Sequence, residues 1–346
     1  MPPSPRPTLK AVAALAGVTT ATVSMALRGS TKISAATTLR VTKAATKVGY
    51  RPDPTLTKLM GYLRQGESRQ VATLGMITVR EKPAAWRENS HLRRYYDAAL
   101  ARGAALGFRI EELWLGAPNL SPRRMKEILL ARGIEGLFVF SGYRWKYFQD
   151  FDFSPFACAT YGRWNGSQRL IDRAGANYYL DLLKVVGELT RLGYRRPGLV
   201  LDEELNERTG QLYSAAFLLA QHNAKTKAGV PIHLPPQSDE KAFAKWFKKH
   251  RPDVLITHSP TPKEYLSWLA RLGCSVPDNV GLAVLDLDIT DPLKPSGIRQ
   301  DSERIGSAVV DMIATKLQRN ERGLPQNPQV LLFEGQWIDG TTTRQQ

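Results

Sequence analysis

The first fifty residues carry the hydrophobic spacing of short helices. Apolar side chains recur with a helical period over residues 9–16, and Gly17 then interrupts the pattern. Thr19 is a suitable N-cap for a second helix over residues 20–27. A third helix is predicted over residues 34–48, with a glycine after it as a left-handed stop. The pattern therefore predicts a small all-α unit of three short helices.

Beyond residue 69 the pattern changes to apolar, strand-like runs that alternate with amphipathic helices. Two of these helices are predicted around residues 92–106 and 122–131, and helices that end in glycine recur before later strands. The strand-like runs span residues 71–79, 108–115, 136–140, 156–161, 197–201, 230–234, 253–257 and 280–287. The alternation predicts an α/β domain of two lobes, each with a parallel sheet. Two such lobes leave a cleft, and open α/β sheets bind ligands at the carboxyl ends of their strands.

The segment between these regions has the start of another helix. Asp53 is a suitable N-cap, and Pro54 stands at the first helical position. The short apolar stripe that follows consists of Leu56, Leu59, Met60 and Leu63. So short a helix is marginal alone. We expect a headpiece over residues 1–52, a hinge helix and linker over residues 53–69, and a large domain over residues 70–340.

Length and composition set broad limits. The chain has 346 residues, 42% of them apolar, which is more than one small core needs, so two or three domains are expected. No run reaches the roughly 18 apolar residues of a spanning helix, and the first ten residues lack the apolar segment of a secretory signal. We therefore expect a cytoplasmic protein with no membrane partner.

The basic charge is concentrated near the N-terminus. Of a formal net charge of +16, residues 1–70 carry +9, because they hold eleven Lys and Arg against two acidic residues. Such a surplus is typical of a surface that binds a polyanion. An anionic membrane surface is the rival partner, but these basic residues are interleaved with helix and turn signals rather than gathered on one long amphipathic helix.

The predicted second helix has an outward face suited to DNA. Its outward residues are mostly small or hydroxylic, so its backbone can approach base edges and its hydroxyls can donate to phosphate. Two short helices joined by a tight turn are the layout of a helix-turn-helix unit, whose second helix enters the major groove. The alternative is an ordinary three-helix bundle whose outward Thr and Ser face water.

Neither a catalytic motif nor a metal-binding pattern is found. Cys158 and Cys274 lie inside or beside apolar runs, as small buried residues do. The five histidines are scattered, with no i, i+4 pair and no neighbouring ligand in a metal-binding pattern. The chain has no G-x-S-x-G, no P-loop and no G-x-G-x-x-G after a strand. We therefore expect neither an enzyme, nor a metal, nor a cofactor.

Two stretches over residues 8–54, "TLKAVAALAGVTTATVSMALRG" and "ISAATTLRVTKAATKVGYRPDP", carry a dense resemblance to a known family. They resemble the head of the LacI (lactose-repressor) family of transcription regulators. The resemblance implies that the second helix enters the major groove. The base contacts that it implies come from Thr20, Ala21, Met25 and Arg28. The other DNA contacts that we expect come from Thr8, Thr22, Ser24 and Tyr50.

The same resemblance implies a role for residues 53–69. In the LacI family this segment is a hinge helix that orders on the operator, pairs with its copy in the dimer and inserts a leucine into the minor groove. The matching leucine is Leu59. The family usually has Ala-Arg where Leu56 and Thr57 stand, so this hinge is more apolar. Either it inserts a larger wedge or it docks against the large domain; we favour the wedge.

The rest of the chain resembles, more weakly, the periplasmic-binding-protein-like effector domain of that family. The match includes "IDRAGANYYLDLLKVVGELTRLGYRRPGLV", "VPDNVGLAVLDLD" and the segment over residues 296–344. It implies that the chain crosses between the lobes three times, near Ile171, Ile298 and Leu324. Lobe 1 would then hold residues 70–170 and 299–323, and lobe 2 residues 171–298 and 324–340.

Three effector-binding residues are implied by the same match: Asp172, Arg208 and Asp286. An arginine fork and carboxylates suit a sugar-like or anionic ligand. Ser259 and Pro260 stand where the family has an Asn-Asp pair, and Arg173 replaces a common Asn, so a standard sugar is not expected. Three tryptophans supply an aromatic floor or else pack in the core: Trp86, Trp145 and Trp164.

The resemblance and the residues together predict a homodimeric transcription regulator, a repressor controlled by a small-molecule effector, that binds a near-palindromic DNA operator. One alternative is a carbohydrate-modifying enzyme on a two-lobe scaffold with a basic docking head. Another is a constitutive DNA binder that has lost its effector.

Overall fold

The structure is a computed structural model of the 346-residue chain. It divides into two compact units, Met1–Gln70 and Val71–Gln346. The described residues are 8–27, 33–48, 50, 72–79, 82, 84–117, 120–140, 148, 150–162, 171–224, 229–236, 238–258 and 262–344. The predicted hinge, residues 53–69, lies outside these ranges.

The first unit contains the three predicted helices: α1 (Leu9–Ala16), α2 (Thr20–Leu27) and α3 (Ala35–Val48). Thr8 caps α1, since its hydroxyl accepts from the Ala11 amide at 3.3 Å. Gly17 ends α1 in the left-handed conformation at φ 65°, where a residue without Cβ is favoured. The predicted cap of α2 is confirmed, because the Thr19 hydroxyl accepts from the Thr22 amide at 3.1 Å.

The three helices pack around one small core. Its buried residues are Val12, Ala13, Ala16, Val23, Ala26, Val41, Ala44 and Ala45. These side chains are mostly small, so the helices approach closely. Among the described residues, no single helix is long and apolar enough to cross a membrane. Together, α1 and α2 have the length and apolar composition of a membrane span, but a bend of 98° separates them. Their buried apolar residues belong to this core.

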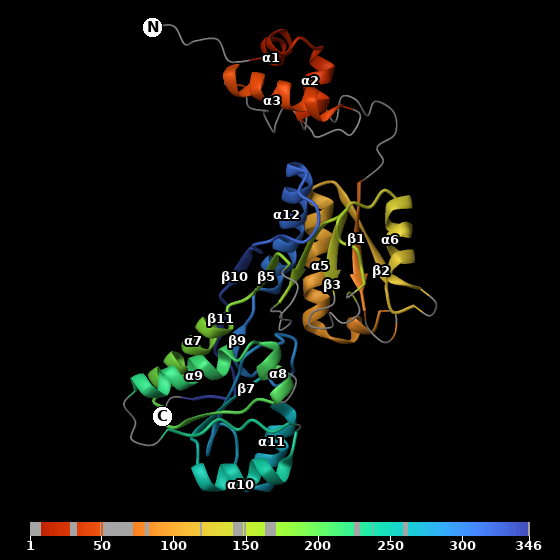
Figure 1. Ribbon diagram of the computed structural model, residues 1–346. Coiled ribbons are helices and arrows are strands. Elements are labelled where there is room, and N and C mark those ends of the chain that lie inside the picture. The colour runs from red at the N-terminus through yellow and green to blue at the C-terminus, as the bar shows by residue number, and fades with distance from the viewer. Residues whose placement is uncertain are drawn as a thin grey trace, which may run out of the picture. The chain divides into compact units, whose positions relative to one another are not determined.

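The second unit contains two sheets (Figure 1). The first is a six-stranded sheet, all parallel, in the order β10-β5-β4-β3-β1-β2. Its strands are β1 (Ala72–Thr78), β2 (Phe108–Trp114), β3 (Gly136–Phe140), β4 (Ala157–Tyr161), β5 (Arg173–Ala176) and β10 (Val330–Phe333). One face packs against α5 (Ser90–Ala105) and α12 (Ser302–Arg319), and the other against α6 (Pro122–Ala131). A short 3-10 helix, η1 (Ala85–Glu88), precedes α5.

The second sheet has the order β11-β9-β8-β7-β6 and is parallel except for β11. Its strands are β6 (Pro197–Leu199), β7 (Val254–Thr257), β8 (Gly281–Val284), β9 (Ser296–Arg299) and β11 (Gln336–Ile338). One face packs against α7 (Tyr178–Arg191), α8 (Glu203–Arg208) and α9 (Leu212–Asn223). The other packs against α10 (Glu240–His250) and α11 (Pro262–Arg271). The predicted fold class, a helical head and a two-lobe α/β domain with parallel sheets, is confirmed.

The crossings between the lobes differ from the expected positions. The chain leaves the first sheet after β5, returns after β9 and leaves again after β10, so the crossings lie near residues 177, 300 and 334. The expected crossing near Leu324 is wrong, because β10 over residues 330–333 still pairs with β5 in the first sheet. The expected strand over residues 230–234 forms only a single bridge, between Val200 and His233.

Candidate DNA-binding interface and ligand cleft

The outward face of α2 is small and polar. Thr20 and Ala21 are exposed, while Val23 and Ala26 turn inward to the core. The Thr22 and Thr19 hydroxyls lie 2.9 Å apart, which fixes the start of the helix. Because the face has no long side chain before Met25, its backbone can come close to a partner surface.

The predicted DNA contacts are only partly within the described residues. Thr22, Ser24 and Met25 are half-buried on α2, and Thr8 is exposed at the start of α1. Tyr50 packs against the headpiece core, and its amide donates to the Ala45 carbonyl at 2.9 Å. The predicted contacts at Arg28 and Leu59 lie outside the described residues.

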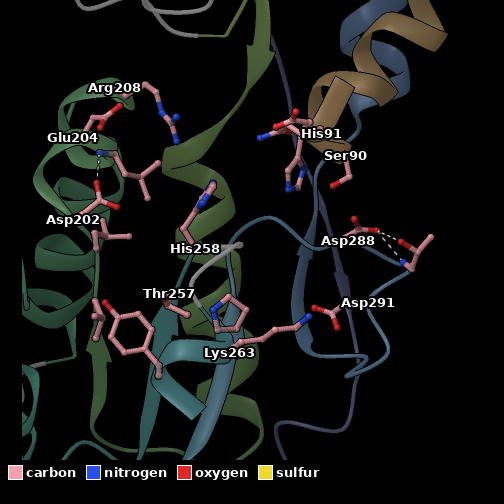
Figure 2. A pocket seen from close by; sticks show the side chains of 18 of the residues that line it. Ser90, His91, Asp202, Glu204, Arg208, Thr257, His258, Lys263, Asp288 and Asp291 are labelled. Atoms are coloured by element: carbon pink, nitrogen blue, oxygen red, sulfur yellow. Dashed lines mark hydrogen bonds between the residues drawn. The ribbon is translucent and has the colours of Figure 1, made fainter. Parts of the chain in front are cut away.

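The second unit contains a cleft of about 820 Å³ between its two lobes. Figure 2 shows side chains from both lobes around this space. Residues 88–91, which follow β1 and begin α5, form the wall from lobe 1. Residues that follow β6, β7 and β8 form the wall from lobe 2. The cleft therefore lies at the carboxyl ends of parallel strands, as the sequence predicts.

Each wall is positioned by a helix cap. The Asn89 side chain accepts from the Leu92 amide at 3.1 Å and fixes the start of α5. The Asp202 carboxylate accepts from the Leu205 amide at 2.6 Å and fixes the start of α8. Arg208, at the end of α8, is thereby held in the cleft wall. Arg208 thus lines the cleft, and its predicted contact with an effector stays a prediction.

The chemistry of the cleft is polar and charged. Figure 2 shows Arg208 and His258 directed into the space on one side and His91 on the other. Carboxylates line the same space, among them Glu88, Asp202, Glu204, Asp288 and Asp291. Hydrogen bonds from Thr290 and Ser90 hold the pKa of Asp288 at about 2, against an opposing effect of burial. A ligand with both hydrogen-bond donors and acceptors suits this mixture.

Asp286 is placed differently from the prediction. It is 5% exposed and is not among the residues that line the cleft. Its Oδ2 lies 2.8 Å from Nδ1 of His91, and its Oδ1 lies 3.7 Å from Nη2 of Arg94. Asp286 follows β8 in lobe 2, whereas His91 and Arg94 stand on α5 in lobe 1. The carboxylate thus joins the two lobes beside the cleft.

The structure places Asp172 away from the cleft, so its predicted role as an effector contact is wrong. Asp172 immediately precedes β5 and therefore stands at the amino end of this strand. Its Oδ2 accepts from Nζ of Lys316 on α12 at 2.5 Å, and its Oδ1 accepts from the Gln329 amide at 2.7 Å. Asp172 is 7% exposed and has both oxygens occupied by the protein. It is a structural ion pair within lobe 1.

The tryptophans do not give the described cleft an aromatic floor. Trp86 is 1% exposed in the core of lobe 1, and its indole N–H donates to Glu112 at 2.8 Å. Of the two predicted alternatives for Trp86, packing in the core is therefore the correct one. Trp145 and Trp164 lie outside the described residues.

The two cysteines differ in burial, because Cys158 is buried and Cys274 is partly exposed. Burial raises the pKa of the Cys158 thiol to about 12, which keeps it protonated and inert. Both cysteines are free. Within the described ranges, no group of three His, Cys, Asp or Glu side chains is placed to hold a metal ion.

Several cleft residues were not predicted from the sequence, namely Ser90, His91, His258, Lys263 and Asp288. A signal exists for His258, Lys263 and Asp288, because each of these three closely follows a strand-like apolar run in the sequence. In a parallel sheet such positions gather at one edge. Examining the residues that follow every predicted strand, in addition to the three positions implied by the family match, would have identified these residues.

Comparisons with known proteins agree with both units. Residues 8–53 match the model of bacterial regulatory proteins of the lacI family. Residues 186–343 match the model of the periplasmic binding protein-like domain. No curated protein matches the chain.

The fold is also found in solved structures of low sequence identity. One is the lac repressor dimer bound to operator and the anti-inducer ONPF, at 16% identity and a TM-score of 0.57, covering 97% of this chain and 99% of that one. Another is the complex of the transcriptional regulator CelR with cellobiose, at 18% and 0.59, covering 97% and 100%. A third is the transcription regulator CcpA of Lactococcus lactis, at 12% and 0.58, covering 80% and 100%.

A helix-turn-helix head joined to a two-lobe, periplasmic-binding-protein-like domain defines a DNA-binding transcription regulator. The chain belongs to the LacI family of bacterial regulatory proteins. This family membership confirms the class of protein and the class of fold that the sequence predicts.

Proposed function

We propose that this regulator is a homodimeric repressor that binds a near-palindromic operator and is controlled by a small molecule bound in the cleft. The observation that carries the DNA-binding part is the headpiece, where α1 and α2 meet at 98° and α2 presents small, polar residues outward. A homodimer is supported by the small footprint of one headpiece and by the dimeric state of the lac repressor in its operator complex.

The proposed DNA contacts follow from the outward face of α2. Thr20, Ala21, Met25 and Arg28 would approach base edges, and Thr8, Thr22 and Ser24 would position the helix on phosphate. Tyr50 is a further proposed DNA contact of the headpiece. Residues 53–69 would form the hinge helix, with Leu59 as the wedge that bends the DNA.

The proposed effector site is the cleft of about 820 Å³. Its volume suits a small molecule, and Arg208 can offer paired donors to hydroxyl or anionic groups. The CelR structure is a complex with cellobiose, and the lac repressor structure contains ONPF. These neighbours support a sugar-like effector here, and an anionic one remains compatible with Arg208 and His258.

We further infer that the chain acts by binding rather than by catalysis, and that it works in the cytoplasm, where its DNA lies. Its family and its structural neighbours are transcription regulators. The effector would act by changing the arrangement of the two lobes, which shifts a pre-existing equilibrium between conformations.

Selection of bound duplexes from a random pool, at near-physiological salt, tests this function. The full-length protein is expected to enrich a two-fold symmetric site with a flexible pyrimidine–purine step at its centre. Binding that shows no sequence preference and vanishes as salt rises would contradict a sequence-specific repressor. The enriched duplex then serves as the probe for screening effectors.

A further inference from the structure

A cluster of side chains joins the two lobes at the edge of the cleft. His91 and Arg94 stand on α5 of lobe 1, and Asp286 follows β8 of lobe 2. Arg94 also donates from Nη2 to the Leu287 carbonyl at 3.4 Å. Side-chain exposure is 14% for His91, 18% for Arg94 and 7% for Asp286, so solvent screens these charges only weakly.

The imidazole of His91 lies between the two charged groups. Its Nδ1 is 2.8 Å from Asp286 Oδ2 and 2.6 Å from Arg94 Nη2. With a proton on Nδ1, His91 donates to Asp286 and links the lobes directly. Without that proton, Nδ1 accepts from Arg94, which is on the same helix, and only Arg94 then links the lobes. The strength of the contact between lobes therefore depends on one proton position.

A second contact beside this cluster also connects the two lobes. Ser90 begins α5 in lobe 1, and its hydroxyl is among the groups that lower the pKa of Asp288 in lobe 2. The positive charge of Arg94 lowers the same pKa. Ser90, His91 and Arg94 at the start of α5 thus all contact the segment after β8, and this segment also lines the cleft.

The cluster is incompletely satisfied. Among the described residues, Asp286 Oδ1 and Arg94 Nε and Nη1 are buried and have no hydrogen-bond partner. Buried polar atoms without partners carry a desolvation cost. A second arrangement, in which the lobes separate and these atoms meet water or a ligand, can therefore compete with the observed one. An ion pair of this kind is suited to a switch between two states.

We propose that His91, Arg94 and Asp286 form a reversible latch that sets the angle between the two lobes in the absence of an effector. The latch concerns the arrangement of the two lobes without a ligand. This proposal therefore does not rest on the proposed repressor activity. An effector in the cleft would act on the latch by offering new partners to its unsatisfied atoms, and the lobes would then move about the three crossings near residues 177, 300 and 334.

Distances between spin labels on the two lobes test the latch. Cysteines are introduced at Arg123 on α6 and Lys245 on α10, both exposed, in a Cys274→Ala background that leaves only buried Cys158. Labelled protein is mixed with excess unlabelled protein, so that each assembly carries at most one labelled copy. The unmodified latch is expected to give one narrow distance distribution.

Asp286→Asn and Arg94→Met are each expected to broaden the distribution and to add a population at longer distance. Asp311→Asn is the matched control, because Asp311 on α12 pairs at 2.7 Å with Arg102 on α5, the helix that carries Arg94, and this pair lies wholly within lobe 1. This control is expected to leave the distribution unchanged. Having two latch variants guards against one that fails to fold. An unchanged distribution in a folded latch variant, or the same broadening in Asp311→Asn, would overturn the proposal.

Discussion

Two buried carboxylates in the second unit, Asp172 and Asp286, look alike in the sequence and differ in what they do. Both directly follow an apolar residue, and both are less than a tenth exposed. Asp172 pairs with Lys316 inside lobe 1 and has both oxygens hydrogen-bonded. Asp286 pairs across the two lobes, and its Oδ1 accepts no hydrogen bond from a described residue. The first holds one lobe together, whereas the second connects two bodies that can move.

The largest expected effect comes from the Asp172 pair. Asp172→Asn leaves the ammonium of Lys316 buried within lobe 1 without its counterion. The free energy of unfolding should fall by about 3–5 kcal/mol, as for other broken buried ion pairs. Urea denaturation followed by circular dichroism measures it. A loss of less than 1 kcal/mol would mean that Lys316 finds water or another partner, and the contrast with Asp286 would fail.

A third buried carboxylate, Asp181 on α7, sharpens the comparison through pH. Burial, with smaller effects of Asp286 and Glu334, raises its pKa to about 7, although the Gly335 amide donates to Oδ1 at 2.7 Å. The unfolded carboxyl ionises near pH 4, so the folded state holds the extra proton between pH 4 and 7. Stability should therefore fall as pH rises through that window, by about 4 kcal/mol in all.

Asp181→Asn removes this proton uptake while it keeps an oxygen for the Gly335 amide. Between pH 4 and 7, the unfolding free energy of the variant should no longer show the fall that Asp181 causes as pH rises. At pH 8 the variant should be more stable than the parent protein. Parallel urea titrations at pH 5 and pH 8 check the sign. Identical pH profiles for the variant and the parent would contradict the assignment.

Asp286→Asn is expected to cost much less stability than Asp172→Asn. The lobes can separate and expose His91 and Arg94 to water, and Arg94 Nε and Nη1 already lack partners among the described residues. The unfolding free energy should fall by about 1 kcal/mol, measured under the same conditions as for Asp172→Asn. Equal losses for the two variants would show that the pair across the lobes is as structural as the pair within one.

The smallest effect is expected at Asp311, whose pair with Arg102 is 41–45% exposed. Asp311→Asn should change the unfolding free energy by about 0.5 kcal/mol or less, because water screens the pair. A loss as large as that of Asp172→Asn would show that exposure does not explain the differences among these pairs.

The comparison also explains how far the sequence could predict this molecule. The helices of the headpiece and the long strands of the second unit follow from periodicity, and they occur where expected. The strands that were missed are β5, β9, β10 and β11; three of them, β5, β9 and β11, contain polar residues or glycine and so give no continuous apolar run. Sheet pairing, not local sequence, makes them strands.

One missed strand accounts for the wrong site assignment. Without β5, Asp172 could not be recognised as standing before a strand, at the edge of the sheet away from the cleft. Asp286 falls inside the strand-like run predicted over residues 280–287, whereas β8 ends at Val284, and its partners on α5 are almost two hundred residues away in the chain. Such long-range pairing has no local signature. Arg208 lines the cleft because it lies on a helix that follows β6 directly, and its contact with an effector stays a prediction.

The claim on which the account rests is that α2 reads DNA. The most direct measurement is the affinity of Ala21→Glu for the duplex enriched by selection, beside Thr42→Glu, which adds the same charge at an exposed position of α3. A carboxylate on the outward face of α2 meets phosphates and base edges, so Ala21→Glu should weaken binding on the order of 100-fold. Thr42→Glu should stay within a few-fold of the parent. Equal affinities of the two variants would contradict the assignment of α2 as the recognition helix.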